Sequence, residues 1–217
     1  MIFSLGRLRA ILPTLPFKTI YGPWARAIGF HHLKIPDRGG WEPSPQPLWP
    51  GGAALQGARF TPKNGFNSLY LAADPVTALH EVVSVFTPPS GPILTLRTSP
   101  WVVIIIEGVL SNIIDLTDIS IQRRLKTTTM ELTGDWAYMQ STKGYAPTQL
   151  LGQAAFDCGI LGFRYKSARN IGGGDSIVVF TDHLAQNKPS YLQVVDEHHN
   201  LMQRLPNRLG SARTRVQ

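Results

Sequence analysis

The sequence is poor in cysteine, in acidic side chains and in long apolar runs. Its 217 residues include one cysteine, Cys158, which excludes an intrachain disulfide framework and a thiolate metal cage. A reducing cytoplasm is therefore the expected compartment. The longest apolar run, residues 101–106, has the length of a strand and is too short to cross a membrane. Basic residues and prolines interrupt the apolar positions of residues 1–17, so we expect no signal peptide there.

Positive charge, by contrast, is in excess. Lys and Arg number 21 against 14 Asp and Glu, which gives a net charge of +7 and a pI near 9.8. This balance favours an anionic partner, which could be nucleic acid, a phosphate-bearing small molecule or an acidic protein. A chain of this length at 43% hydrophobic content is typical of one packed domain. We expect a lead-in over residues 1–20, the main domain over 21–195 and a basic, frayed tail over 196–217.

Apolar patterning predicts a mixture of strands and helices, and hence an α+β fold. Strands are expected at residues 68–72, 93–97, 102–109, 176–181 and 191–195. The β-branched run at 102–109 is typical of a strand buried on both faces, and 191–195 is expected at a sheet edge. A helix is expected from Pro147 to Cys158, and Asp118 is a candidate helix cap. Residues 36–52 are dense in proline and glycine, which predicts a long surface loop.

The stretch at residues 57–86 is the one around which we expect the chain to be organised. Residues 68–72 are apolar at alternate positions, which predicts a strand. Asp74 followed by proline predicts a helix start, because an acceptor side chain precedes a residue whose φ suits the first helical turn. The helix is expected to continue through residues 78–86, with one apolar stripe formed by Val76, Leu79, Val82, Val83 and Phe86.

Three candidate functional residues lie in this stretch at a constant interval. Arg59, Tyr70 and Glu81 are eleven residues apart each time. A strand that runs into a helix brings such side chains to one edge of a sheet, where sites commonly form. Each residue also has a structural interpretation: Arg59 bonding backbone carbonyls in a turn, Tyr70 in the core, and Glu81 solvated beside the apolar stripe. Their joint spacing favours a functional site.

Several familiar site patterns are missing. The glycines at 172–174 lack the spacing of a phosphate-binding loop or a dinucleotide fingerprint. The adjacent histidines at 31–32 and at 198–199 have neither the spacing nor the cysteine neighbours of a zinc site, so no metal is expected. No serine stands in a Gly-x-Ser-x-Gly motif, which disfavours a serine hydrolase.

Three segments together resemble the RES domain family, named for an arginine, a glutamate and a serine. They are ARAIGF, GARFTPKNGFNSLYLAADPVTALHEV and FDCGILGFRYKSARNIGGGDSIVVF, and they span most of residues 21–181. By motif, Arg59, Glu81 and Ser167 correspond to the three residues of the family name. Tyr70 matches the tyrosine of the strand before the helix, and Arg26 matches an arginine of the N-terminal strand. The proline-rich insertion between Arg26 and Arg59 departs from the family pattern.

The resemblance implies an ADP-ribosyltransferase-like fold and an NAD-consuming toxin of a type II toxin–antitoxin pair. Its catalytic domain would cover residues 21–195. The enzyme would deplete NAD as a glycohydrolase or phosphorylase, or would transfer ADP-ribose to a protein, and the sequence does not choose the acceptor. The implied partner is an antitoxin, a DNA-binding protein of helix-turn-helix type, that covers the NAD cleft. No metal is implied.

The residue types suit the chemistry of NAD. Forked guanidinium donors fit phosphate oxygens, so Arg26 and Arg59 are expected to bind the pyrophosphate. Tyr70 is expected to stack on nicotinamide or ribose, and Ser167 to position substrate rather than act as a nucleophile. Glu81 is expected to hold a ribose hydroxyl and to stabilise the cationic sugar that forms as the nicotinamide bond breaks.

Two non-enzymatic functions remain as alternatives. The basic tail, with Arg204, Arg208, Arg213 and Arg215, could contact phosphates of a nucleic acid, although no reading helix or aromatic platform accompanies it. The proline-rich loop at 36–52 could instead be the contact surface of a partner-binding module. Nicotinamide release from NAD would separate the enzyme from both alternatives.

Overall fold

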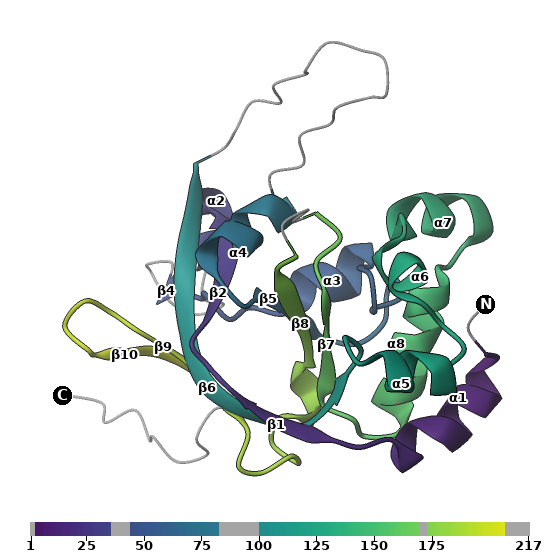
Figure 1. The fold of residues 1–217 in the computed structure, drawn as a ribbon. Helices are drawn as coiled ribbons and strands as arrows, with labels where there is room; N and C mark the ends of the chain where they lie inside the picture. The colour runs from purple at the N-terminus through teal and green to yellow at the C-terminus, as the bar shows by residue number, and fades with distance from the viewer. Residues whose placement is uncertain (1–2, 36–43, 83–99, 170–172, 207–217) are drawn as a thin grey trace.

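An eight-stranded mixed sheet forms the centre of the molecule (Figure 1). The computed structural model describes residues 3–35, 44–82, 100–169 and 173–206. The strands of the sheet are β1 (Lys18–Tyr21), β2 (Trp24–Gly29), β5 (Ser68–Ala72), β6 (Trp101–Asp115), β7 (Gly162–Lys166), β8 (Asp175–Phe180), β9 (Tyr191–Val195) and β10 (Leu201–Leu205). A separate short pair joins β3 (Lys34–Ile35) to β4 (Ser44–Pro45).

The long strand β6 connects the two halves of the sheet. Its first half pairs antiparallel with β2, from Trp101 opposite Gly29 to Ile106 opposite Trp24. Its last three residues pair in parallel with β7. Because β2, β5, β8 and β7 are also paired in that order, the sheet closes on itself, while β1, β9 and β10 extend it from β6.

Helices gather on two sides of the sheet. In Figure 1, α5, α6, α7 and α8 lie with α1 beyond β7 and β8, and α4 lies beside β2. The helices are α1 (Leu5–Ile11), α2 (Phe30–Leu33), α3 (Gly51–Gln56), α4 (Pro75–Val82), α5 (Ile119–Arg124), α6 (Thr129–Thr133), α7 (Trp136–Lys143) and α8 (Pro147–Asp157), with 3-10 turns η1 (Leu12–Thr14) and η2 (Thr181–His183). Among the helices that the structure describes, none has the length and apolar character to cross a membrane.

The core has two large parts, one on each face of the strands around β8. On the helical face, Phe60, Phe163 and Phe180 pack with leucines of α1, α6 and α8. On the other face, Leu69 and Leu71 of β5 pack with apolar residues of β6, β8 and β9. A third, small cluster of alanines joins α4 to β2 and β5: Ala25, Ala27, Ala72 and Ala78. Such small side chains let the helix lie close to the sheet.

Most of the expected elements are confirmed. The strands predicted at 68–72 and 176–181 are β5 and β8, and the helix expected from Pro147 is α8. Asp118 caps α5 through a side-chain oxygen that accepts from the backbone N–H of Ser120 at 2.8 Å. The strand expected at 93–97, and the part of the central helix beyond residue 82, lie outside the described residues.

Two expectations about burial in the sheet are wrong. The run at 102–109 belongs to β6, but it is not buried on both faces, because Ile105 is 49% exposed while its neighbours Ile104 and Ile106 face the core. A run of β-branched residues indicates a preference for strand. It does not indicate whether a second layer covers the outer face of that strand. The strand at 191–195 is not at an edge either, since β9 lies between β6 and β10.

The two ends of the domain are more ordered than expected. The lead-in forms α1, η1 and β1, and Leu8, Leu12 and Leu15 are buried in the core. The frayed tail expected from residue 196 begins instead with a hairpin, because residues 201–205 form β10 against β9. Residues 207–217, with three of the four tail arginines, lie outside the described residues.

The proline-rich segment at 36–52 is only partly a surface loop. Residues 36–43 lie outside the described residues, but Leu48 is fully buried and Gly51 begins α3. The backbone N–H of Leu48 donates to Gln203 Oε1 of β10 at 2.7 Å. Composition indicated a loop here because Pro and Gly disfavour regular structure, whereas distant contacts hold part of the segment in the fold.

Candidate active site

The corner between β5 and α4 positions the central residues of the site. Asp74 Oδ1 accepts from the backbone N–H of Thr77 at 2.8 Å, and its Oδ2 accepts from the Thr77 hydroxyl at 2.6 Å. Pro75 occupies the first helical position, as expected. This N-cap, together with the alanine contacts between α4 and β2, fixes the helix that carries Glu81. Tyr70 comes from the strand immediately before it.

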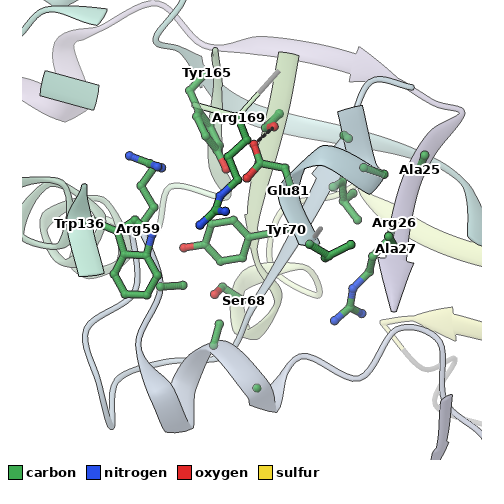
Figure 2. A pocket seen from close by; sticks show the side chains of 18 of the residues that line it. Ala25, Arg26, Ala27, Arg59, Ser68, Tyr70, Glu81, Trp136, Tyr165 and Arg169 are labelled. Atoms are coloured by element: carbon green, nitrogen blue, oxygen red, sulfur yellow. Dashed lines mark hydrogen bonds between the residues drawn. The ribbon is translucent and has the colours of Figure 1, made fainter. Parts of the chain in front are cut away.

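A pocket of about 340 Å³ opens beside this corner (Figure 2). Four of the five residues expected from the sequence line it: Arg26, Arg59, Tyr70 and Glu81. The fifth, Ser167, lies directly behind Glu81 and donates a hydrogen bond to it. The remaining walls come from α3, from β2 and from the N-terminus of α7. The structure therefore brings the expected residues into one place from segments far apart in the chain.

Glu81 is held by two hydroxyl groups. Its Oε1 accepts from Ser167 Oγ at 2.6 Å and from Ser176 Oγ at 3.3 Å, and Figure 2 shows its carboxylate directed into the pocket. Hydrogen bonds of this kind restrict the rotation of a carboxylate. Among the residues that the structure describes, Oε2 accepts no hydrogen bond, so this second oxygen keeps its acceptor capacity.

Tyr70 is fixed by its hydroxyl. The oxygen accepts from the backbone N–H of Phe60 at 2.9 Å and lies 3.1 Å from Thr61 Oγ1, which in turn lies 2.6 Å from Ser68 Oγ. Burial raises the pKa of Tyr70 to about 12. The phenol is therefore neutral at physiological pH, and its ring forms a rigid wall of the pocket.

A second phenol, Tyr165, lines the pocket beside Glu81. Its pKa is raised well above the usual value, first by burial and then by the negative charge of Glu81. Both phenols therefore stay protonated next to the carboxylate, and Glu81 supplies the negative charge on this side of the pocket.

The two expected arginines bond to backbone carbonyls. Arg26 donates from Nη1 to Pro47 O at 2.8 Å and from Nη2 to Trp49 O at 3.2 Å, which holds the segment before α3. Burial lowers the pKa of Arg26 to about 10, so the side chain is still a cation near neutral pH. Arg59 Nη1 donates to the carbonyls of both Leu132 and Gly134 at 2.8 Å.

The sequence also allows a structural role for Arg59, in which it bonds to backbone carbonyls. Its Nη1 makes bonds of this kind. The carbonyls are not those of its own turn but lie 73 and 75 residues away. Figure 2 shows the guanidinium directed away from Tyr70. These bonds use two of its five N–H donors, so contact with a phosphate group stays a prediction for Arg59 and for Arg26.

Four residues of the site were not found from the sequence: Trp136, Tyr165, Arg169 and Ser176. Trp136 begins α7, directly after the N-cap Asp135. Arg169 lies two residues after Ser167, which was the only local signal for it, and Figure 2 shows its guanidinium inside the pocket near Tyr70. Ser176 lies on β8, a strand whose apolar pattern indicated burial but gave no signal of a polar contact.

Among the described residues, no group of three or more His, Cys, Asp or Glu side chains is placed to hold a metal ion. The cations of the pocket are the arginines, and its anion is Glu81. The arrangement offers one fixed carboxylate, several aromatic surfaces and guanidinium groups within one cleft. It can therefore receive a ligand that carries flat rings, hydroxyls and negative charge.

Comparison with known proteins identifies the fold and the family of this chain. The toxin–antitoxin complex MbcT–MbcA of M. tuberculosis contains a chain of similar fold, with a TM-score of 0.64 and 20% sequence identity over 91% of this chain and 90% of that one. The expected α+β fold is thereby confirmed. A search of the curated proteins found no match. The model of the RES domain matches residues 32–200, a range that includes Arg59, Tyr70, Glu81 and Ser167 but not Arg26, and the chain belongs to the RES domain family.

Proposed function

We propose that this protein is the toxin of a type II toxin–antitoxin system and that it cleaves NAD at the bond between nicotinamide and ribose. The observation that carries the proposal is the Glu81 carboxylate, fixed by Ser167 and Ser176 with one oxygen directed to a pocket walled by Tyr70. Membership of the RES family and the fold shared with a chain of a toxin–antitoxin complex support it. A cytoplasmic site of action follows, since NAD is a cytoplasmic metabolite.

The proposed reaction breaks the bond between the ribose anomeric carbon and the ring nitrogen of nicotinamide. The electron pair of that bond moves to the nicotinamide ring, which leaves as a neutral molecule, and positive charge develops on the sugar. Glu81 stabilises this charge, an interaction that is strongest in the transition state and so raises the rate. An acceptor nucleophile then bonds to the anomeric carbon and loses its proton.

Ser167 and Ser176 act through Glu81. Their hydroxyls fix the orientation of its carboxylate before substrate arrives, so that no rearrangement is needed as charge develops. Tyr70 stacks on the nicotinamide or on its ribose, and its neutral hydroxyl keeps the ring in place. The arginines of the pocket supply the positive potential that draws the pyrophosphate in.

The acceptor decides which enzyme class applies. Water gives a glycohydrolase, phosphate gives a phosphorylase, and a side chain gives a protein ADP-ribosyltransferase, which is the second candidate because all three share the first step. The partner is an antitoxin of helix-turn-helix type that covers the pocket. The chain of similar fold comes from a toxin–antitoxin complex, which supports a protein partner.

The test is incubation of the purified protein with NAD, with nicotinamide release followed in time and all products identified by mass spectrometry. We expect nicotinamide together with ADP-ribose, its phosphate ester, or a modified protein. The absence of nicotinamide release would contradict the proposal. Tight binding to duplex DNA that weakens steeply with salt would then favour the nucleic-acid alternative.

A further inference from the structure

Trp136 has a position that its own helix does not explain. It is the first residue of α7, a helix in which no side chain is fully buried, yet its indole is half-buried and lines the pocket. Asp135 caps this helix, since its Oδ1 accepts from the backbone N–H of Tyr138 at 3.0 Å. The turn before α7 therefore presents a large aromatic surface to the ligand (Figure 2).

Contacts from three directions hold that surface in place. Arg59 is only 8% exposed and binds the carbonyl of Leu132, near the end of α6, and that of Gly134, in the turn before α7. Gln140, one turn further along α7, accepts from Gln149 Nε2 of α8 at 2.6 Å, and its Nε2 donates to Gln56 O of α3 at 3.3 Å. The indole thus stands on a fixed support, which lowers the entropy cost of binding a ring against it.

The position of Trp136 relative to Glu81 indicates which ring it receives. In Figure 2 the ring of Tyr70 stands between Trp136 and Glu81. If Glu81 and Tyr70 surround the nicotinamide riboside, the ring at Trp136 is not the one bonded to that ribose. The other flat ring of a dinucleotide is the adenine, which lies beyond the pyrophosphate. Stacking on an indole is a general way of binding a nucleobase.

We propose that Trp136 stacks on the adenine ring of NAD and that Arg59 is a positioning residue, which keeps the turn of Trp136 in its binding geometry. The proposal rests on the proposed function for the choice of ligand. It does not rest on cleavage, because an adenine nucleotide can bind to the same wall without reacting.

The test measures binding in the Glu81→Gln background, so that no ligand is consumed. Dissociation constants for ADP-ribose and for nicotinamide mononucleotide are determined by calorimetry, with and without Trp136→Ala. We expect Trp136→Ala to weaken ADP-ribose binding on the order of 10- to 100-fold, and nicotinamide mononucleotide, which has no adenine, to change by less than about threefold. Trp136→Phe, which keeps an aromatic face, should restore most of the ADP-ribose affinity.

Three results would overturn the adenine assignment. Equal losses for the two ligands would mean that Trp136 supports the pocket as a whole. A loss confined to nicotinamide mononucleotide would place the nicotinamide on Trp136, and unchanged binding of both would remove Trp136 from the site. The urea unfolding midpoint of each variant shows whether the fold is intact. Selective ADP-ribose binding without any NAD turnover by the wild-type protein would uphold this inference and refute the proposed function.

The role of Arg59 is tested by a double-mutant cycle. If Arg59 acts through Trp136, Arg59→Ala should weaken ADP-ribose binding selectively, and the combined variant with Trp136→Ala should bind no more weakly than the weaker single variant. Losses that multiply in the combined variant would contradict the positioning role. They would show instead an independent contact of Arg59 with the ligand, such as the pyrophosphate.

Discussion

The two ends of the pocket are built in different ways. At the Glu81 end, side chains bond to side chains, because the carboxylate from α4 accepts from hydroxyls that follow β7 and belong to β8. At the Trp136 end, a side chain bonds to backbone, because Arg59 binds the carbonyl of Leu132 in α6 and that of Gly134 in the turn before α7. The first arrangement directs a charge into the pocket, whereas the second fixes the shape of its wall.

Substitutions at the two ends should therefore have different effects. A change at the Glu81 end removes a charge from a half-buried position and should alter the rate with little effect on folding. Removal of the Arg59 guanidinium at the Trp136 end leaves two carbonyls without this partner, and so should alter stability together with binding. The substitutions below probe this separation.

The largest effect is expected from Glu81→Ala. Loss of one well-placed electrostatic group commonly lowers a rate by about 100- to 1000-fold. Expression of this variant without the antitoxin should therefore no longer arrest growth, and NAD levels in the cells should stay normal. Growth arrest by a Glu81→Ala protein that is present at wild-type amounts would place the chemistry elsewhere.

Arg59→Ala should cost stability as well as activity. The substitution leaves the carbonyls of Leu132 and Gly134 unpaired next to the core, and each such group costs about 1–3 kcal/mol. Urea unfolding should show a loss of about 3 kcal/mol in the free energy of unfolding, and the cells should tolerate this variant too. Arg59→Lys, which keeps a donor, should lose less. If the free energy of unfolding of Arg59→Ala equals that of Glu81→Ala, the proposed difference between the two ends is wrong.

Gly152→Ala should disturb both ends together. A Cβ at Gly152 of α8 would lie 1.7 Å from the carbonyl oxygen of Phe60, which follows Arg59 and whose N–H binds the Tyr70 hydroxyl. Overpacking of this kind costs about 1–3 kcal/mol. Gly6→Ala is the matched control, because a Cβ there meets nothing within 4 Å and should leave the thermal midpoint unchanged or raise it. A midpoint for Gly152→Ala equal to that of the control would contradict this packing.

The smallest effects are expected from the two serines behind Glu81. Ser167 Oγ lies 2.6 Å from the carboxylate oxygen and Ser176 Oγ lies 3.3 Å from it, so the first hydrogen bond is the stronger. We expect kcat for NAD to fall about 10-fold in Ser167→Ala and about threefold in Ser176→Ala, with KM nearly constant. The reverse order in steady-state kinetics would show that the closer hydroxyl is not the one that orients Glu81.

The sequence predicts the Glu81 end far better than the Trp136 end. Tyr70 and Glu81 belong to a strand and a helix whose patterns are local, and the resemblance to the RES family added Ser167. Trp136 depends on contacts between Arg59 and carbonyls more than 70 residues away, and no local pattern records such contacts. Ser176 and Tyr165 lie on strands with strong apolar patterns, where a pattern indicates burial but not which polar atom meets a carboxylate.

The errors in the fold have the same origin. The pattern at 102–109 identified a strand but not the exposure of Ile105, which depends on what covers the outer face of β6. The sequence of β10, Leu-Met-Gln-Arg-Leu, has little apolar alternation, and this strand exists through its pairing with β9. Local preference thus predicted the elements, whereas tertiary pairing decided their surroundings.

The central claim is that Glu81 stabilises the transition state of nicotinamide release rather than the bound NAD. The most direct test measures NAD binding and nicotinamide release on the same sample of Glu81→Gln, with the wild-type protein beside it. We predict a dissociation constant within about fivefold of the wild-type value and a release rate about 100- to 1000-fold lower. Release at the wild-type rate, or a loss of binding large enough to explain the lost rate, would contradict the claim.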